Sequence, residues 1–178
     1  MLNTFGAKVL RLILVFGAAL LVTASIWQFD SSAADNSSST SKFGPKWQAL
    51  IGEWKGQDNS GTCGFHFDLG EHVIVRTNLA TLAGTTAPHS DLMIISADGG
   101  GDKGRAAYWD NEGHVIEYTA SWSTDGNTLT FLSKPGPGPQ FRLIYKKSDG
   151  ESFTVNFEMA SPGQSTFRSY ASGKITRR

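Results

Sequence analysis

The stretch that decides the fold is residues 46–56, which read KWQALIGEWKG. Trp47 and Leu50 stand at the spacing of a helical turn, and Gly52 begins a Gly-Glu-Trp segment directly after that turn. A glycine lets the backbone bend out of the turn, and a large aromatic ring can fill the floor of a small barrel. We therefore expect a helical turn and a first strand, with Trp47 and Trp54 closing one end of a β-barrel.

Downstream of this stretch, the sequence alternates in a way that predicts strands. In residues 62–69, Cys63 and Phe65 share one face while His66 lies on the other, as in a half-buried strand. Asp125-Gly126 is a strong hairpin signal. We count about ten such segments at roughly 8–12-residue spacing. They are 52–56, 62–69, 72–78, 91–96, 105–110, 114–122, 128–132, 141–146, 153–159 and 166–175.

The connections between these segments favour one architecture. They are short and rich in glycine, proline and aspartate, and they contain no amphipathic helix long enough for a parallel crossover. We therefore predict an all-β domain, a single antiparallel up-and-down β-barrel of about ten strands with a short N-terminal helical turn. A β-sandwich is the alternative, but Greek-key sandwiches need longer cross-connections than these hairpins provide.

The composition of the chain predicts three regions. Residues 1–29 contain two basic residues followed by an apolar run over 12–27, which indicates a cleaved signal peptide or an N-terminal membrane anchor. Residues 30–42 are rich in serine and have almost nothing to bury, so we expect a disordered linker. Residues 43–178 form the barrel domain. The protein is then exported, either periplasmic or secreted, or held at the inner membrane by residues 12–27.

Charge and cysteine content exclude several functions. The 16 basic and 16 acidic residues balance, so the chain has no electrostatic reason to bind nucleic acid, and we expect membrane contact only through the N-terminal segment. The single cysteine, Cys63, cannot form an internal disulfide. On an apolar face it is expected to pack as a small hydrophobe, because a nucleophilic thiol needs a basic partner that the sequence does not place.

The candidate ligand-binding residues are mostly aromatic side chains of the predicted strands. A ten-stranded barrel is too wide to be filled completely by side chains, so these residues are expected to line a pocket, with plain core packing as the alternative. His114 falls on the face of Ile116 and Tyr118, where it would orient a polar ligand or hydrogen-bond within the core. The candidates are Trp109, His114, Tyr118, Trp122, Phe131, Tyr145, Phe157, Arg168 and Tyr170.

The Gly52-Glu53-Trp54 start, the turn before it and the meander resemble the calycin superfamily over residues 44–176. The pattern is related to lipocalins, fatty-acid-binding proteins and nitrobindin-like barrels, and it most resembles uncharacterised bacterial lipocalin-like domains. This resemblance implies an exported, non-catalytic barrel that binds a small hydrophobic or amphipathic ligand. Arg168-Ser169-Tyr170 resembles the Arg-x-Tyr pair with which fatty-acid-binding proteins hold a carboxylate. A surface or barrel-closing pair is the alternative.

Cofactor and catalytic signals are weak. Nitrobindin-like barrels hold haem through a histidine near the C-terminal strand, and no histidine follows His114 here. Of the four histidines, His66, His72, His89 and His114, only His66 and His72 flank one hairpin turn and could approach each other as metal ligands. His66 shares its face with Asp68, which is expected to be solvated. No Gly-x-Ser-x-Gly elbow occurs. We therefore expect no cofactor, no metal and no assigned catalytic residue. A haem-type or otherwise catalytic barrel, and a ligand-free structural or interaction module of the cell envelope, remain the alternatives.

Overall fold

The computed structural model describes residues 43–57, 59–81, 87–99 and 101–178. The predicted signal peptide or anchor and the serine-rich linker lie outside the described residues. The barrel belongs to a compact unit that spans Ser37–Arg178. Within the described part of the chain, no helix combines the length and the apolar character needed to cross a membrane.

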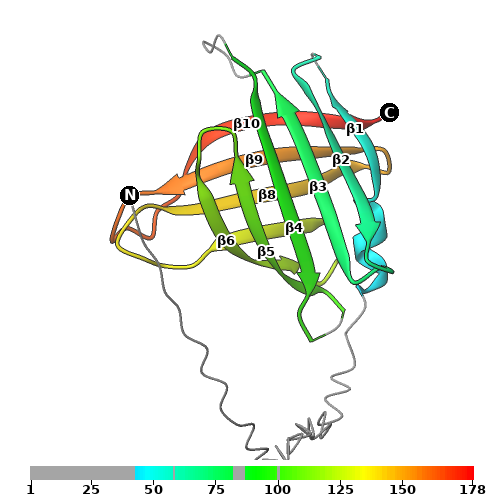
Figure 1. Cartoon of the computed structure of the whole chain (residues 1–178), viewed down its shortest axis with the longest axis horizontal. Helices are drawn as coiled ribbons and strands as arrows, with labels where there is room; N and C mark the ends of the chain where they lie inside the picture. Colours follow the sequence, from blue (N-terminus) through cyan, green and yellow to red (C-terminus); the bar gives the residue numbers. More distant parts are fainter. Residues whose placement is uncertain (1–42, 58, 82–86, 100) are drawn as a thin grey trace, which may run out of the picture. The chain divides into compact units, whose positions relative to one another are not determined.

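The barrel begins with one turn of 3-10 helix, η1 (Pro45–Ala49), and continues as ten strands (Figure 1). The predicted helical turn and all ten predicted strands are present, although several strand ends differ by a few residues. The strands are β1 (Gly52–Gly56), β2 (Gly61–Asp68), β3 (Val73–Ala80), β4 (His89–Ala97), β5 (Lys103–Asp110), β6 (Val115–Trp122), β7 (Thr128–Ser133), β8 (Gln140–Asp149), β9 (Ser152–Ala160) and β10 (Arg168–Arg177).

The strands form one closed antiparallel barrel in which each strand pairs with its sequence neighbours. The first and last strands complete the ring, since Trp54 of β1 pairs with Arg177 of β10 and Gly56 pairs with Ile175. Closure leaves no free sheet edge to pair with another chain. The all-β, up-and-down barrel predicted from the sequence is therefore confirmed, and the sandwich alternative is wrong.

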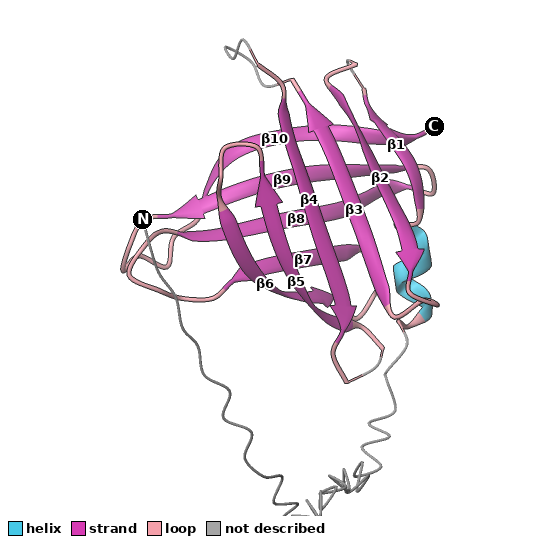
Figure 2. Cartoon of the chain, viewed as in Figure 1, coloured by secondary structure: helices cyan, strands magenta, loops and turns pink. Residues whose placement is uncertain are grey.

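One end of the barrel is plugged by η1, which lies at the end toward which β2 and β4 run (Figure 2). Trp47 is completely buried, its indole Nε1 donates to Gly101 O at 2.9 Å, and its ring packs edge-on against Trp122. Lys46 Nζ reaches Asp102 Oδ2 at 2.6 Å and Ser123 O at 3.1 Å. These contacts tie η1 to two neighbouring turns, so we call this the closed end.

The C-terminal residues contribute to the same end. From the sequence alone, the final pair Arg177-Arg178 is expected to be a solvated tail, but the structure shows that this expectation is wrong for Arg177. Its guanidinium donates to Ile51 O at 2.8 Å and lies 4.4 Å from the centre of the Trp54 ring. Because β10 pairs with β1, the end of the chain lies beside the segment that joins η1 to β1.

The half of the interior nearest the closed end is filled with aromatic rings. Trp54 packs edge-on against Phe153 with the ring centres 5.1 Å apart, and Phe65 packs against Tyr145 at 5.6 Å. Phe131 also contacts Tyr145, at 6.2 Å. Each such ring removes on the order of 150–250 Å² from water, so this packed half supplies much of the stability of a chain without disulfides.

Candidate ligand-binding site at the open end of the barrel

The other end of the barrel is formed by the connections that follow β1, β3, β5, β7 and β9. Inward-facing side chains near this open end, such as Tyr108, Ile116, Phe141 and Phe157, pack against the core but are only half-buried. A side chain that faces the interior and still meets solvent must border a space that is open to the outside. The interior is therefore solid near η1 and accessible near the open end.

Gly173 of β10 lies next to open space. It pairs with Val155, and its neighbours Ala171 and Ile175 pair with Phe157 and Phe153, so these positions share the inner face. A Cβ atom built on Gly173 would meet no atom within 4 Å. The wall of β10 next to Phe157 is thus lined with open space rather than packed side chains.

A buried ion pair lies inside the barrel below this space. Arg76 of β3 and Asp91 of β4 are 6% and 3% exposed in their side chains, and Arg76 Nη1 donates to Asp91 Oδ1. Asp91 Oδ2 also accepts from Asn78 Nδ2 at 2.8 Å. The Arg76 guanidinium has the Cys63 thiol and the Tyr145 hydroxyl as neighbours, while its Nε has no hydrogen-bond partner among the described residues. The arginine charge is therefore compensated within the protein.

Cys63 is buried, as predicted, and it does have a basic neighbour. Burial raises the pKa of the Cys63 thiol above its ordinary value, although the Arg76 charge acts in the opposite direction. The thiol therefore stays neutral at physiological pH and packs as part of the core. The arrangement does not make Cys63 a nucleophile.

From this ion pair, polar contacts continue towards the open end. His89 Nε2 lies 3.4 Å from Asp91 Oδ2 and 3.0 Å from the Tyr108 hydroxyl. That hydroxyl donates to Asp110 Oδ2 at 3.1 Å. Burial, aided by the Asp91 and Asp110 charges, raises the pKa of Tyr108, so its proton is retained as a hydrogen-bond donor.

Asp110 ends β5 at the rim of the barrel. Its Oδ1 accepts the backbone N–H groups of His114 at 2.9 Å and Glu112 at 3.0 Å, and its Oδ2 lies 2.9 Å from His114 Nδ1. Burial favours a higher pKa for Asp110, but these hydrogen bonds outweigh it and hold the pKa below its ordinary value. Asp110 is therefore a carboxylate. We call the connected set Arg76, Asn78, His89, Asp91, Tyr108, Asp110 and His114 the mouth network.

The opposite wall of the open half is aromatic. The rings of Phe141 on β8 and Phe157 on β9 stack with their centres 5.7 Å apart and their planes at 9°. Tyr170 of β10 packs edge-on against Phe157 at 5.9 Å. The open half therefore has a polar side on β3–β5 and an apolar side on β8–β10.

Several of the sequence-predicted site residues lie inside the barrel. Tyr118, Phe131 and Tyr145 are buried in the interior, and Phe157 lies on the aromatic wall. Trp122 faces inward too, but it packs against Trp47 at the closed end, away from the accessible space. Trp47 and Trp54 are both buried at that end.

Two predicted placements are wrong. Trp109 does not face the interior; it is 39% exposed on the outer surface, where it pairs with Leu92. Adjacent residues of a strand face opposite sides, and Tyr108 takes the inner position. His114 does not lie on the inner face of β6, which begins at Val115; its side chain is 62% exposed at the rim and turned towards Asp110.

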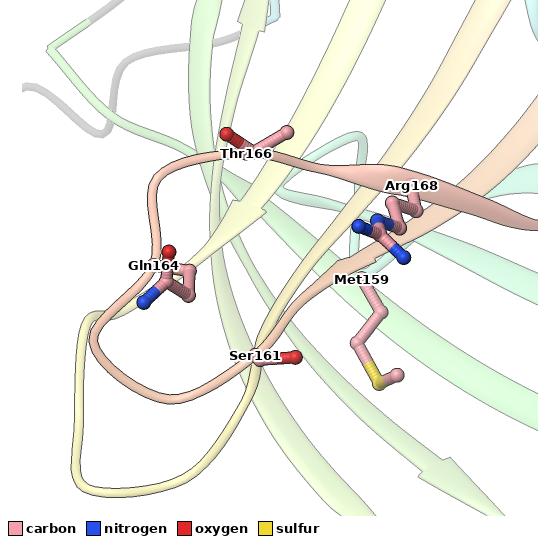
Figure 3. A pocket seen from close by; sticks show the side chains of 5 residues that line it. All are labelled: Met159, Ser161, Gln164, Thr166 and Arg168. Carbon is pink, nitrogen blue, oxygen red and sulfur yellow. The ribbon is translucent and has the colours of Figure 1, made fainter.

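Arg168 and Tyr170 do not form the expected carboxylate clamp. The pairing of β10 with β9 shifts between Ser169 and Ala171, and this irregularity breaks the rule that residues two apart face the same way. Tyr170 is 69% exposed beside Phe157. Arg168 and Met159 border a shallow pocket of about 190 Å³ at the β9–β10 connection of the open end, which Ser161, Gln164 and Thr166 complete (Figure 3).

The mouth network was missed by sequence reasoning, although a signal for it exists. Arg76 stands in phase with Ile74 in its strand, and Asp91 stands in phase with Met93 and Ile95 in the next strand. Two opposite charges at inward positions of adjacent strands predict a buried ion pair, because an unpaired charge there would be too costly. Within the described residues, no group of three or more His, Cys, Asp or Glu side chains is arranged to hold a metal ion.

Comparison with known proteins agrees with the fold. The structure is similar to the crystal structure of Rv2717c from M. tuberculosis, with a TM-score of 0.56 and 14% sequence identity over 77% of this chain and 99% of that chain. At this identity the likeness shows a shared barrel fold and nothing about activity. No protein-family model matches the sequence, and no curated protein matches it.

Proposed function

We propose that this protein is an exported, lipocalin-like barrel of the calycin type that binds a small amphipathic molecule through its open end and carries out no catalysis. The observation that carries the proposal is the open space at the inner face of Gly173, beside rings that remain accessible from the same end. The signal-peptide pattern of residues 1–29 supports export to the periplasm or the medium, and the serine-rich residues 30–42 would link that segment to the barrel.

The two walls indicate the chemistry of the ligand. Its apolar part would lie on the stacked rings of Phe141 and Phe157. Its polar part would meet the Tyr108 hydroxyl near the rim, whose oxygen can accept a further hydrogen bond beside its contacts with His89 and Asp110. Because Asp91 already neutralises Arg76 and Asp110 is ionised, a carboxylate head would be repelled there. An uncharged head group, such as an alcohol or an amide, fits this environment best.

The haem alternative has less support from the residues. A histidine-ligated haem, as in nitrobindin-like barrels, needs a histidine nitrogen that is free and faces the cavity. The inward nitrogen of His89 is already shared between Tyr108 and Asp91, and His114 lies at the rim with Nδ1 directed to Asp110. The packed closed end is the observation that supports the other alternative, a ligand-free structural module. That alternative becomes the favoured function if the open end binds no ligand.

A head-group series tests the proposal. The purified protein is titrated with the neutral fluorophore N-phenyl-1-naphthylamine, which is then displaced with dodecanol, dodecanamide, dodecanoate and dodecylamine. We expect saturable binding with one site, and displacement by the alcohol or the amide at concentrations at least about tenfold lower than by the carboxylate. An absence of saturable binding for the fluorophore and for every member of the series contradicts the proposal.

Two neighbouring positions on β10 provide matched variants. Gly173→Trp places a ring in the open space, whereas Ser172→Trp places the same ring on the outer face of the same strand. We expect the first variant to lose fluorophore binding by more than about tenfold and the second to bind like the parent. Thermal unfolding confirms that both are folded, and equal binding by the two variants would place the ligand outside the barrel.

A further inference from the structure

The outer face of β4, β5 and β6 carries large apolar side chains that neither the core nor the open end uses. Leu92 and Ile94 are each 38% exposed, Trp109 is 39% exposed and Val115 is 63% exposed. The strand register aligns Leu92, Trp109 and Val115 in a single row across three strands. We call these four residues the outer patch. A contiguous exposed apolar surface of this kind marks an interaction site more often than isolated apolar residues do.

The shape of the outer patch combines a projection and a hollow. The partly exposed indole of Trp109 borders a shallow hollow of about 360 Å³, whose other lining residues are Ser90, Asp91, Leu92, Asp110 and Asn111. A two-fold axis through such a surface would place the projecting ring of each copy over the hollow of the other. In a two-fold contact the same patch serves both partners, so it must contain both complementary shapes.

The charges around the outer patch also suit a second copy of the same chain. The described charged side chains on the outer face of β5 and β6 are Lys103, Arg105 and Glu117. Arg105 pairs with Asp98, and Glu117 pairs with Lys134. Two identical copies can therefore meet at the patch without bringing unpaired like charges together. Only Lys103, at the far end of β5, is left to attract an anionic membrane surface.

We propose that the outer patch is the interface of a homodimer with two-fold symmetry. The three strands that carry the patch are spaced about 4.8 Å apart and are eight or nine residues long at about 3.3 Å per residue, so they present roughly 400 Å² of sheet on each copy. Standard stable interfaces use about 800 Å² per partner. The dimer is accordingly a reversible one, with dissociation in the micromolar range, rather than an obligate assembly.

Sedimentation velocity tests the interface on the full chain and on the Ser37–Arg178 unit in parallel. We expect the weight-average mass to rise from one copy towards two between about 1 and 200 µM. Leu92→Lys introduces like charges across the axis, and we expect it to remain monomeric over this range. Thr154→Lys adds the same charge at an exposed position of β9 on another part of the barrel, and we expect it to dimerise like the parent. Circular dichroism verifies that both variants fold.

Several outcomes would overturn the proposal. A parent protein that stays monomeric at 200 µM has no such dimer. A dimer that survives Leu92→Lys uses another surface, and an open-ended series of larger species contradicts two-fold closure. Co-flotation of a monomeric parent with vesicles of phosphatidylethanolamine and phosphatidylglycerol, lost in Leu92→Lys, would assign the patch to a membrane instead.

Discussion

Arg76 and Asp91 stand at inward positions of β3 and β4, in phase with apolar side chains, and they are nearly inaccessible to solvent. A buried ion pair adds little net stability, because the loss of hydration offsets the attraction between the charges. Removing one partner is strongly destabilising, since the remaining charge stays buried without a counter-ion. The pair therefore favours one register between β3 and β4, although it adds little to the free energy of unfolding.

Asp91→Asn should destabilise the protein by about 3–5 kcal/mol, because the Arg76 charge then stays buried without its counter-ion. The double variant Arg76→Met/Asp91→Leu replaces the pair with apolar groups and should lie within about 2 kcal/mol of the parent. Urea denaturation of the three proteins provides the free energies of unfolding. If the double variant is as unstable as the single one, the pair has a structural role beyond charge compensation.

Arg177 gives a second prediction at this scale. Its guanidinium donates to Ile51 O at 2.8 Å and to Ala49 O at 3.3 Å, both in the segment that plugs the closed end. Arg177→Ala leaves these carbonyls without their donor and should cost about 1–3 kcal/mol. Arg178→Ala changes an exposed side chain next in the sequence and should change stability by less than about 0.5 kcal/mol. Similar urea midpoints for the two variants would show that Arg177 is a solvated tail after all.

At the scale of elements, the β6–β7 turn shows how local chemistry defines a hairpin. Asp125 Oδ1 accepts from Ser123 Oγ at 2.5 Å and from the Asn127 backbone N–H at 3.1 Å. Gly126 follows with a φ of +68°, a conformation that favours glycine. The Asp-Gly pair predicted this hairpin correctly, because all the groups involved are within a few residues of each other.

The same contacts lower the pKa of Asp125. The Ser123 hydroxyl contributes most, followed by the Asn127 backbone N–H and side chain, and together they lower the pKa from 3.8 to about 2. The carboxylate therefore stabilises the folded state above pH 3.8, and this contribution disappears as the pH falls through about 2. Carbon-13 NMR should show the Asp125 carboxyl titrating near pH 2, and Ser123→Ala should shift it upwards. A midpoint near 3.8 in the parent protein would mean that the turn does not hold the carboxylate.

The side chains that face the interior were harder to predict than the positions of the strands in the sequence. The Tyr108-Trp109 pair offers two aromatic residues for one inner position, and only the pairing with β4 and β6 assigns that position to Tyr108. The irregularity between Ser169 and Ala171 likewise changes which side chains of β10 face inward. Both features depend on neighbouring strands, so residue alternation within one segment could not reveal them.

At the scale of the whole molecule, the pairing of β10 with β1 closes the barrel. Pairing of β1 with β10 joins segments at opposite ends of the domain, and without it both β1 and β9 would present an unpaired edge. Such edges promote association between chains.

Removal of β10 by ending the chain after Ser161 should therefore yield protein that aggregates or remains insoluble. Removal of Arg178 alone is the control and should leave a soluble barrel. The soluble fraction after expression and the far-UV circular dichroism spectrum measure the outcome. A soluble, monomeric nine-stranded product would show that closure is not required.

The sequence by itself determined the strand segments, their turns, the single antiparallel barrel and the plugging of one end by the turn at Trp47. These depend on local periodicity and turn chemistry, which neighbouring residues specify. Only the tertiary structure decided the mouth network, the outward position of Trp109 and the contacts of Arg177. Each of these depends on the register between strands distant in sequence and on which half of the barrel is packed, and a one-residue shift in register would reverse the faces.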